Sequence, residues 1–335
     1  MKIGELGEFN MIRRILPRFP APSGAIKGIG DDCAVLPGAP GRVQLVTTDL
    51  LVERVHFLLD RITPEELGHK ALAVNASDIA AMGGQPTAAF LSIGLPPTIE
   101  VEWIDRLFAG IEALSRQIRC PLLGGDTTRS MTDMVINFAV LGDAAENEIK
   151  LRSTARPGDV VAVTGFLGDS GAGLRLLLER HRTDRPDCDY LVRAHHAPMP
   201  HLAEGGWLAR RMGVHAMMDV SDGIDSDIHR IMEQSGVGAG IELEQLPLSA
   251  PMRNVCHAHG WDALELAATG GEDYCLLCTV EGAAYEAVSL DFVRTFGKPL
   301  HAIGTIRSEP GLRYTRGGRP ARLAGHGFDH FASPG

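Results

Sequence analysis

The stretch TPEELGHKALAVNASDIAAMGG, residues 63–84, carries the clearest secondary-structure signals in the chain. Thr63 and Glu66 have the spacing of a capping box, Pro64 stands at the first helical position, and two glycines close the segment. These signals predict one helix with defined ends. The interpretation of the neighbouring segments starts from this helix.

One face of the predicted helix ends in a carboxylate. Leu67, Ala71, Val74 and Asp78 recur at intervals of three or four residues, so Asp78 continues the apolar face. A charge in such a position needs a partner, because an unpaired charge is costly to bury. The pattern therefore predicts that Asp78 meets a cation.

Strand-like and helix-like segments alternate around this helix. Residues 43–52, 133–144 and 158–165 have the apolar pattern of strands, and residues 100–120 repeat apolar side chains at helical spacing. Such alternation is typical of layered folds that combine helices and sheets. We therefore predict the α/β (α+β) class.

A chain of 335 residues is long enough to form two domains. A polar, turn-rich segment, AENEIKLRSTARPG, separates the strand-like residues 133–144 from the strand-like residues 158–165. A boundary is expected there, near residues 143–157. The predicted domains are residues 1–145 and residues 146–335.

Composition and charge exclude several classes of function. The net charge is −10 and no block of Lys or Arg occurs, which argues against binding of nucleic acid or of an anionic membrane surface. Charges interrupt the opening segment, so neither a signal peptide nor a membrane span is expected. The six cysteines are scattered, and Cys275 and Cys278 fall on opposite faces of a strand-like run. Reduced thiols and a cytoplasmic location are the prediction.

Acidic residues recur at one kind of position, where an apolar strand ends or a glycine-rich turn begins. The first example, GIGDDCAVLP at residues 28–37, contains two adjacent aspartates. Any one acid could cap a helix or shape a turn. No Lys or Arg stands beside them in the sequence to pair with the whole set. The set comprises Asp31, Asp32, Asp49, Asp126, Asp219, Asp222, Glu272 and Asp273.

Clustered carboxylates flanked by hydroxyl groups suit a hard divalent cation, and so many acids indicate several Mg²⁺ ions. The spaced acids of an EF-hand loop, which would favour Ca²⁺, do not occur in the sequence. A P-loop motif does not occur either, and VTGFLGDSGAG at residues 163–173 lacks the glycine order of a dinucleotide-binding loop. A phosphorylated substrate would therefore be bound through metal ions more than through lysines.

Three histidines lie close together in AHHAPMPH, residues 194–201. They suggest a metal site at first sight. Histidines beside prolines in a loop are more typical of the surface, so we expect His195, His196 and His201 to be exposed.

Eight motifs in order along the chain resemble those of one family, the thiamine-monophosphate kinases of the aminoimidazole-ribonucleotide-synthetase-like superfamily. The motifs are GIGDDCAVL, TTDLLVERVHF, ALAVNASDIAAMGGQP, GGDTTRS, VTGFLGDSGAGL, MDVSDGI, TGGEDY and GFDHF. The resemblance runs nearly end to end, and the order and spacing of the motifs make it specific. It implies a two-domain fold of mixed sheets covered by helices, and a homodimer formed through the amino-terminal sheet.

The resemblance also implies roles for individual residues. The residues that match metal ligands are Asp32, Thr47, Thr48, Asp49, Asp78, Asp126, Asp219 and Asp222. Those that match ATP contacts are Phe108, Gly125, Asp126, Arg152 and Ser221, and those that match thiamine-phosphate contacts are His56, Glu272 and Phe328. Family members often have Tyr where this chain has Phe108, which could stack but could not donate a hydrogen bond. Without the resemblance, His56 would be interpreted as a half-buried histidine with satisfied hydrogen bonds, Arg152 as a solvated residue of a polar turn, and Phe328 as an anchor of the carboxy-terminal tail.

The implied reaction moves the γ-phosphoryl group of ATP onto thiamine monophosphate, producing thiamine diphosphate and ADP. The second pKa of a phosphate monoester is about 6, so the attacking oxygen needs no general base at neutral pH. Mg²⁺ ions would neutralise the two polyanions and align a direct in-line displacement. No catalytic base or nucleophile of the protein is predicted.

The sequence is also compatible with other functions. One alternative is another ATP-dependent enzyme of the superfamily, such as aminoimidazole ribonucleotide synthetase, formylglycinamidine synthetase, selenophosphate synthetase or the hydrogenase-maturation enzyme. The last would be expected to end in a reactive Cys, whereas this chain ends in DHFASPG. A non-enzymatic protein that binds metal or thiamine phosphate and a metal-dependent phosphohydrolase are the remaining alternatives.

Overall fold

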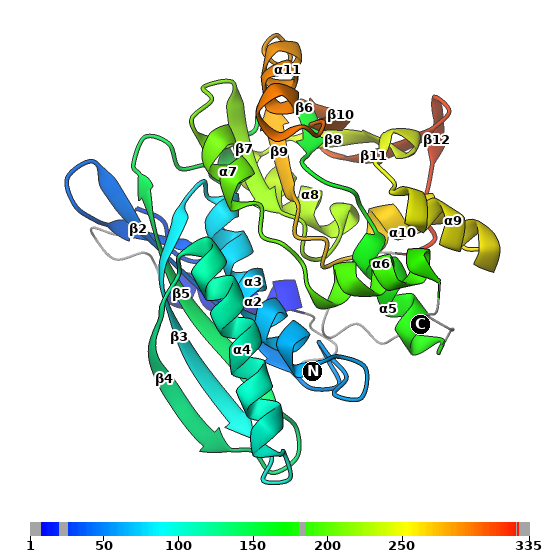
Figure 1. Cartoon of the computed structure of the whole chain (residues 1–335). Helices are drawn as coiled ribbons and strands as arrows, with labels where there is room; N and C mark the ends of the chain where they lie inside the picture. Colours follow the sequence, from blue (N-terminus) through cyan, green and yellow to red (C-terminus); the bar gives the residue numbers. More distant parts are fainter. Residues whose placement is uncertain (1–7, 20–25, 181–184, 326, 328–335) are drawn as a thin grey trace.

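The computed structural model describes residues 8–19, 26–180, 185–325 and 327. Its amino-terminal part forms a mixed five-stranded sheet in the order β1-β2-β5-β3-β4 (Figure 1). Strands β3 and β4 are parallel, and the other neighbouring strands are antiparallel. The strands are β1 (Ala34–Pro37), β2 (Arg42–Val52), β3 (Gln85–Leu95), β4 (Leu122–Arg129) and β5 (Val135–Ala145).

A second mixed sheet has seven strands in the order β12-β11-β8-β10-β6-β9-β7. The strands are β6 (Val160–Val163), β7 (Val214–Asp219), β8 (Gly238–Glu242), β9 (Leu276–Val280), β10 (His301–Arg307), β11 (Gly311–Arg316) and β12 (Arg319–Ala321). The predicted α/β (α+β) class with mixed sheets is therefore confirmed. The predicted division after residue 145 falls in the segment between the two sheets, where a short 3-10 helix, η2 (Arg152–Thr154), lies.

Most of the helices pack on the two sheets, whereas α2 (Glu8–Ile15) contacts mainly the 3-10 helix η1 (Leu16–Arg18). The other helices are α3 (Pro64–Ala81), α4 (Val101–Ile118), α5 (Asp169–Leu178), α6 (Pro186–His196), α7 (Leu202–Ala209), α8 (Ile224–Ser235), α9 (Ala250–His259), α10 (Ala263–Thr269) and α11 (Tyr285–Phe296), with the 3-10 helix η3 (Leu243–Gln245). None of these helices, within the described residues, has the length and apolar character needed to cross a membrane.

Helix α3 has the predicted ends and lies at the centre of the molecule. The Thr63 side chain accepts a hydrogen bond from the Glu66 backbone N–H, and the Glu66 side chain accepts one from Thr63, as in a capping box. A Cβ atom at Gly68 would lie 2.1 Å from the Leu107 carbonyl oxygen, and one at Gly110 would lie 2.0 Å from that of Glu65. Helices α3 and α4 therefore pack backbone to backbone, on one side of the first sheet (Figure 1).

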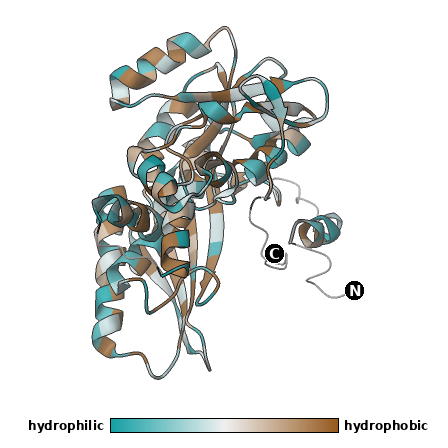
Figure 2. Ribbon diagram, turned by 90° about the vertical axis from the view of Figure 1, so that its right-hand side faces the viewer, coloured by the Kyte–Doolittle hydropathy of each residue, from teal (hydrophilic) through white to brown (hydrophobic). Residues whose placement is uncertain are grey.

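The two halves of the chain share one apolar cluster around α3. It extends from the first sheet to Trp207, Met217 and Phe292 of the second half, and apolar and polar stretches alternate along the helices and strands of both halves (Figure 2). Cys278 of strand β9 lies in this cluster, and Cys275, which directly precedes β9, lies in a second cluster. Their opposite faces agree with the predicted strand alternation. All six cysteines lie in described residues and are buried and free of disulfide bonds.

Candidate active site

A cavity of about 1950 Å³ lies between the two halves of the molecule. It exceeds the roughly 300–1000 Å³ that is usual for one small ligand, so two ligands fit. Most of the predicted site residues line it. They are Asp32, Thr47, Thr48, Asp49, His56, Asp78, Arg152, Asp219, Ser221, Asp222 and Glu272.

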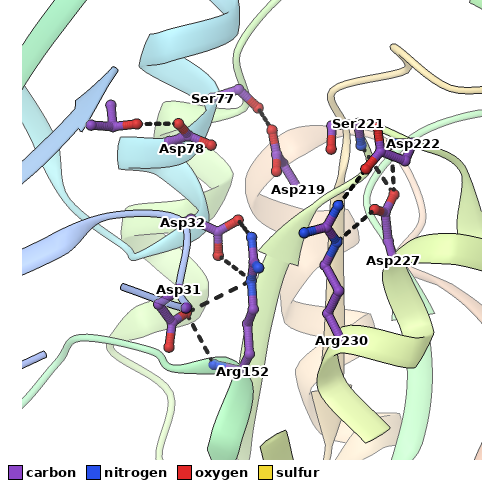
Figure 3. A network of polar contacts seen from close by, with 12 residues as sticks. Asp31, Asp32, Ser77, Asp78, Arg152, Asp219, Ser221, Asp222, Asp227 and Arg230 are labelled. Carbon is purple, nitrogen blue, oxygen red and sulfur yellow. Dashed lines mark hydrogen bonds and ion pairs between the residues drawn. The ribbon is translucent and has the colours of Figure 1, made fainter. Parts of the chain in front are cut away.

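Three carboxylates of the cavity lining, those of Asp32, Asp78 and Asp219, lie close together (Figure 3). Asp32 precedes β1, Asp78 lies on α3 and Asp219 ends β7, yet each offers an oxygen atom within 4.8 Å of the others. The Thr47 hydroxyl donates a hydrogen bond to Asp78, and the Ser77 hydroxyl donates one to Asp219 at 2.6 Å. Carboxylate and hydroxyl oxygens are the hard ligands that Mg²⁺ and Ca²⁺ take in proteins.

The proximity of these acids shifts their proton equilibria. Burial and the charge of Asp32 raise the pKa of Asp219 to about 7. Burial and the charge of Asp222 raise the pKa of Asp49 to about 6. Burial, followed by the charges of Asp49 and Asp219, raises the pKa of Asp78 well above its usual range. The cluster is therefore short of positive charge.

Arg152 supplies part of that charge in this structure. Its Nε and Nη2 atoms donate to Asp32 at 3.2 and 2.5 Å, and its Nε lies 3.8 Å from Asp31. The Lys27 ammonium lies 3.0 Å from the other oxygen of Asp31. The expectation that no nearby Lys or Arg pairs with the acids is thus wrong for Asp31, because Lys27 lies only four residues before it. Arg152, in contrast, is 120 residues from Asp32 in sequence. The contact between Arg152 and a phosphate group of ATP stays a prediction.

A second polar group surrounds the loop after β7 (Figure 3). The Asp227 carboxylate accepts hydrogen bonds from the backbone N–H groups of Ser221 and Asp222 at 3.1 and 3.2 Å. Arg230 donates to the Asp222 carboxylate at 2.5 Å. Asp227 and Arg230 were not predicted as site residues, and they belong to α8, which begins two residues after Asp222.

The two described residues that match thiamine-phosphate contacts both lie in loops. His56 follows β2, and its Nδ1 atom accepts a hydrogen bond from the Val52 N–H at 3.0 Å, so its neutral form carries the hydrogen on Nε2. Glu272 precedes β9, and its backbone N–H donates to the Ser221 carbonyl at 2.7 Å. The third, Phe328, lies outside the described residues.

Four of the predicted residues lie apart from the carboxylate cluster. Thr48 points to the face of β2 opposite Thr47, and its hydroxyl donates to the Phe138 carbonyl at 2.9 Å. Asp126 and Gly125 lie on β4, which is exposed, and Phe108 is 38 % exposed on α4. Among the described residues these last three do not line the cavity.

The histidines of residues 194–201 correct one expectation. His195 and His196 are each only 4 % exposed and end α6, so their predicted exposure is wrong. The His195 Nδ1 atom lies 3.1 Å from the Glu272 carboxylate. Lys70, at 0 % exposure on α3, lies 3.0 Å from the same group and was also not predicted. Two features of the sequence could have indicated these residues. One is a lysine, Lys70, among the apolar residues of a helix, and the other is the adjacent pair His195 and His196.

The raised pKa values predict how stability depends on pH. Because the pKa of Asp219 and of Asp49 in the fold exceeds the usual value of about 4, the metal-free fold holds these protons more tightly than the unfolded chain. The stabilisation is present at low pH and is lost as the pH rises through 6 to 7. We expect the free energy of unfolding in EDTA to fall by roughly 2–4 kcal/mol between about pH 5.5 and pH 8.

Urea denaturation at several pH values in EDTA measures this fall. Addition of Mg²⁺ should reduce it, because a bound cation favours the ionised carboxylates. A free energy of unfolding that stays constant or increases towards pH 8 in EDTA would contradict the prediction.

Comparison with known proteins places the chain in a family. Residues 30–144 match the model described as "AIR synthase related protein, N-terminal domain", and residues 156–316 match that of the C-terminal domain. The thiamine-monophosphate kinase of Escherichia coli K12 is 39 % identical over 334 residues, which are 98 % of this chain and 99 % of the relative. That of Salmonella typhimurium is 37 % identical over 331 residues, again 98 % and 99 %.

A solved structure agrees with these relatives. The structure described as "AaThiL complexed with AMPPCP and TMP" has a TM-score of 0.86 and 32 % identity to this chain, and covers 98 % of this chain and 99 % of its own. Family models, sequence relatives and this structure extend over both halves of the chain. The chain therefore belongs to the thiamine-monophosphate kinase family of AIR synthase related proteins.

Proposed function

We propose that this protein transfers the γ-phosphoryl group of ATP to thiamine monophosphate, producing thiamine diphosphate and ADP. The observation that carries the proposal is the cluster of Asp32, Asp78 and Asp219 in a cavity large enough for two ligands. The related AaThiL structure, which was obtained with AMPPCP and TMP, supports the same pair of substrates.

The donor atoms of the cluster fit Mg²⁺, because they are hard oxygens on residues whose mutual repulsion calls for a cation. Asp32, Asp78 and Asp219 would hold the metal, with Thr47, Asp49 and Asp222 beside them. Bound there with ATP, Mg²⁺ supplies charge neutralisation and alignment of the phosphates. Several ions are proposed, since more acids are present than one ion needs.

The residues of the chain bind and orient the reactants. The acceptor phosphate is mostly deprotonated at neutral pH, so its oxygen attacks the γ-phosphorus directly. A bond forms from that oxygen to phosphorus, and the bond from phosphorus to the β,γ-bridging oxygen breaks, releasing ADP. Arg152 and Ser221 would bind ATP, and Arg152 becomes available to phosphate when Asp32 binds Mg²⁺ instead. His56, Glu272 and Phe328 would bind thiamine monophosphate.

We propose that the protein is a homodimer and that it works in the cytoplasm, where the free thiols stay reduced. The first sheet supports a dimer, because the strand register places Leu50, Phe90 and Asp126 on the face opposite α3 and α4. Leu50 is 51 % exposed and Phe90 is 39 % exposed. Exposed apolar residues on one face of a sheet are typical of an interface.

A dimer would also explain where Asp126 and Gly125 act. In the order β2-β5-β3-β4, three strand spacings separate β4 from β2, which is roughly 14 Å at about 4.8 Å per spacing. Asp126 therefore cannot join the cluster of its own chain, and we propose that it completes the site of the partner. Phe108, which lies on the helical side, stays a predicted ATP contact.

The function is tested by incubating the protein with ATP, Mg²⁺ and thiamine monophosphate and separating the products by chromatography. Equal amounts of thiamine diphosphate and ADP, formed only with the monophosphate, are the expected result. Parallel reactions contain free thiamine or no acceptor. ADP without thiamine diphosphate would indicate a phosphohydrolase or another reaction of the superfamily, and folded protein that forms no ADP would indicate a binding protein.

A further inference from the structure

We propose that Lys70 and His195 are positioning residues, which hold the Glu272 carboxylate in one orientation towards the thiamine part of the acceptor. The inference rests on the proposed function, in which Glu272 binds thiamine monophosphate. Neither Lys70 nor His195 belongs to a motif that the sequence analysis assigned to a ligand.

Lys70 is buried in an unusual way. It lies in the middle of α3 and is 0 % exposed, although lysine is almost never fully buried unless it is paired. Its ammonium group donates to the Oε2 atom of Glu272 at 3.0 Å. Lys70 comes from the amino-terminal half and Glu272 from the carboxy-terminal half, and both line the cavity. The pair therefore connects the halves at the site.

His195 reaches the same carboxylate oxygen from another helix. Its Nδ1 atom lies 3.1 Å from Oε2 of Glu272 and 3.0 Å from the Ser170 hydroxyl. Burial, followed by the charge of Lys70, lowers the pKa of His195 well below its usual range, so the ring is neutral. The hydrogen bond of Nδ1 is with the Ser170 hydroxyl, and the ring edge that carries Nδ1 also faces Oε2 of Glu272. Lys70 and His195 therefore both approach Oε2, which leaves Oε1 to a molecule in the cavity.

The backbone around Glu272 is also held in place. Glu272 and Tyr274 have φ values of 61° and 49°, in the left-handed region that costs energy for residues other than glycine. Hydrogen bonds hold this conformation, since the Tyr274 N–H donates to the Val220 carbonyl at 2.9 Å and the Asp273 carboxylate accepts from the Gly168 N–H at 2.6 Å. Backbone strain of this kind is concentrated at functional sites.

Lys70 could instead bind the acceptor phosphate directly. The geometry favours the positioning role, because the ammonium group is buried and paired with Glu272. The two roles differ in what they do to unphosphorylated thiamine. A lysine that acts through Glu272 affects thiamine and thiamine monophosphate equally, whereas a lysine that binds phosphate affects only the monophosphate.

The test compares Lys70→Met with Lys150→Met. Lys150 is also partly buried, but it donates to the Val214 carbonyl at 2.7 Å and lies outside the cavity lining. For Lys70→Met we expect the KM for thiamine monophosphate to rise by about 10- to 100-fold with a small change in the KM for ATP. Calorimetry should give the same fold loss of affinity for thiamine and for thiamine monophosphate, and Lys150→Met should change neither.

Two further comparisons make the test specific. Lys70→Met combined with Glu272→Gln should lose no more affinity than Glu272→Gln alone, because Lys70 acts only through that carboxylate. His195→Asn, which keeps a polar group near the Nδ1 position, should retain most of the affinity that His195→Phe loses. If Lys70→Met does not fold, the comparison of His195→Asn with His195→Phe tests the proposal.

Three results would overturn the inference. Loss of affinity for the monophosphate alone would make Lys70 a phosphate ligand. If the losses of affinity add in the double variant, Lys70 does not act through Glu272. Equal changes in Lys70→Met and Lys150→Met, together with equal losses in melting temperature, would make Lys70 a structural residue. Failure of the proposed function is distinguishable, because the unchanged protein would then bind neither thiamine compound.

Discussion

Replacing Asp219 by Asn is expected to lower kcat/KM by about three orders of magnitude and to raise the melting temperature of the metal-free protein. The carboxylate offers an oxygen to the shared cluster with Asp32 and Asp78, and metal binding there would stabilise transition-state charge by several kcal/mol, at 1.36 kcal/mol per tenfold in rate. Asparagine keeps an oxygen that can accept from Ser77, but it removes one negative charge.

The opposite signs of the two effects make this prediction informative. Asp219 is only 2 % exposed, and replacing a buried residue usually destabilises a protein. Here the melting temperature in EDTA should rise, because the charge of Asp219 meets that of Asp32 without full compensation. In saturating Mg²⁺ the melting temperature of Asp219→Asn should be lower than that of the unchanged protein, since the variant loses a metal ligand. Thermal unfolding with EDTA and with Mg²⁺ measures both.

Asp159→Asn is the matched control. Asp159 is also 2 % exposed, but it lies outside the cavity lining and accepts hydrogen bonds from the Arg156 N–H and from His215, each at 2.9 Å. Its replacement should lower the melting temperature and leave kcat/KM nearly unchanged. An Asp219→Asn protein with near-normal turnover, or one that is less stable in EDTA, would contradict the metal cluster.

Replacing Asp126 by Asn is expected to abolish turnover although Asp126 lies far from the cluster of its own chain. This follows from the proposed homodimer, in which Asp126 completes the site of the partner. Purified Asp126→Asn should keep its fold, because the side chain is exposed in the single chain. It should also keep its dimeric state, because asparagine has nearly the same size as aspartate. Activity assays and light scattering measure the two properties.

Mixed dimers separate action within a chain from action between chains. A dimer of one Asp126→Asn chain and one Asp219→Asn chain has one site with both aspartates intact, if the two residues of a site come from different chains. Co-expression with random pairing makes half of the dimers mixed, so activity should return to about a quarter of the normal value. If both residues acted in one chain, the mixture would stay inactive.

Polar contacts between the halves of the chain surround the cavity. Ser77 binds Asp219, Arg152 binds Asp32 and Lys70 binds Glu272, and each contact joins residues at least 120 positions apart. The apolar cluster around α3 continues behind them. Since both halves supply charges of the site, small movements between them would change its geometry.

Features that depend on neighbours along the chain could be predicted from the amino-acid sequence. The ends of α3 follow from Thr63, Pro64 and Glu66, and the place of Asp78 on its inner face follows from helical spacing. Alternation along β9 predicted that Cys275 and Cys278 enter different clusters. The order of the motifs indicated the family, because many short matches at matching spacing are specific together.

Which charges from distant parts of the chain meet depends on the tertiary structure. Arg152 pairs with Asp32 and Lys70 with Glu272 across 120 and 202 residues, and no periodicity or capping rule reaches so far. The same limit explains the error for His195, which a local pattern of histidine and proline placed at the surface. Local patterns report which side of an element is buried, whereas the partner of a buried charge depends on how distant elements pack.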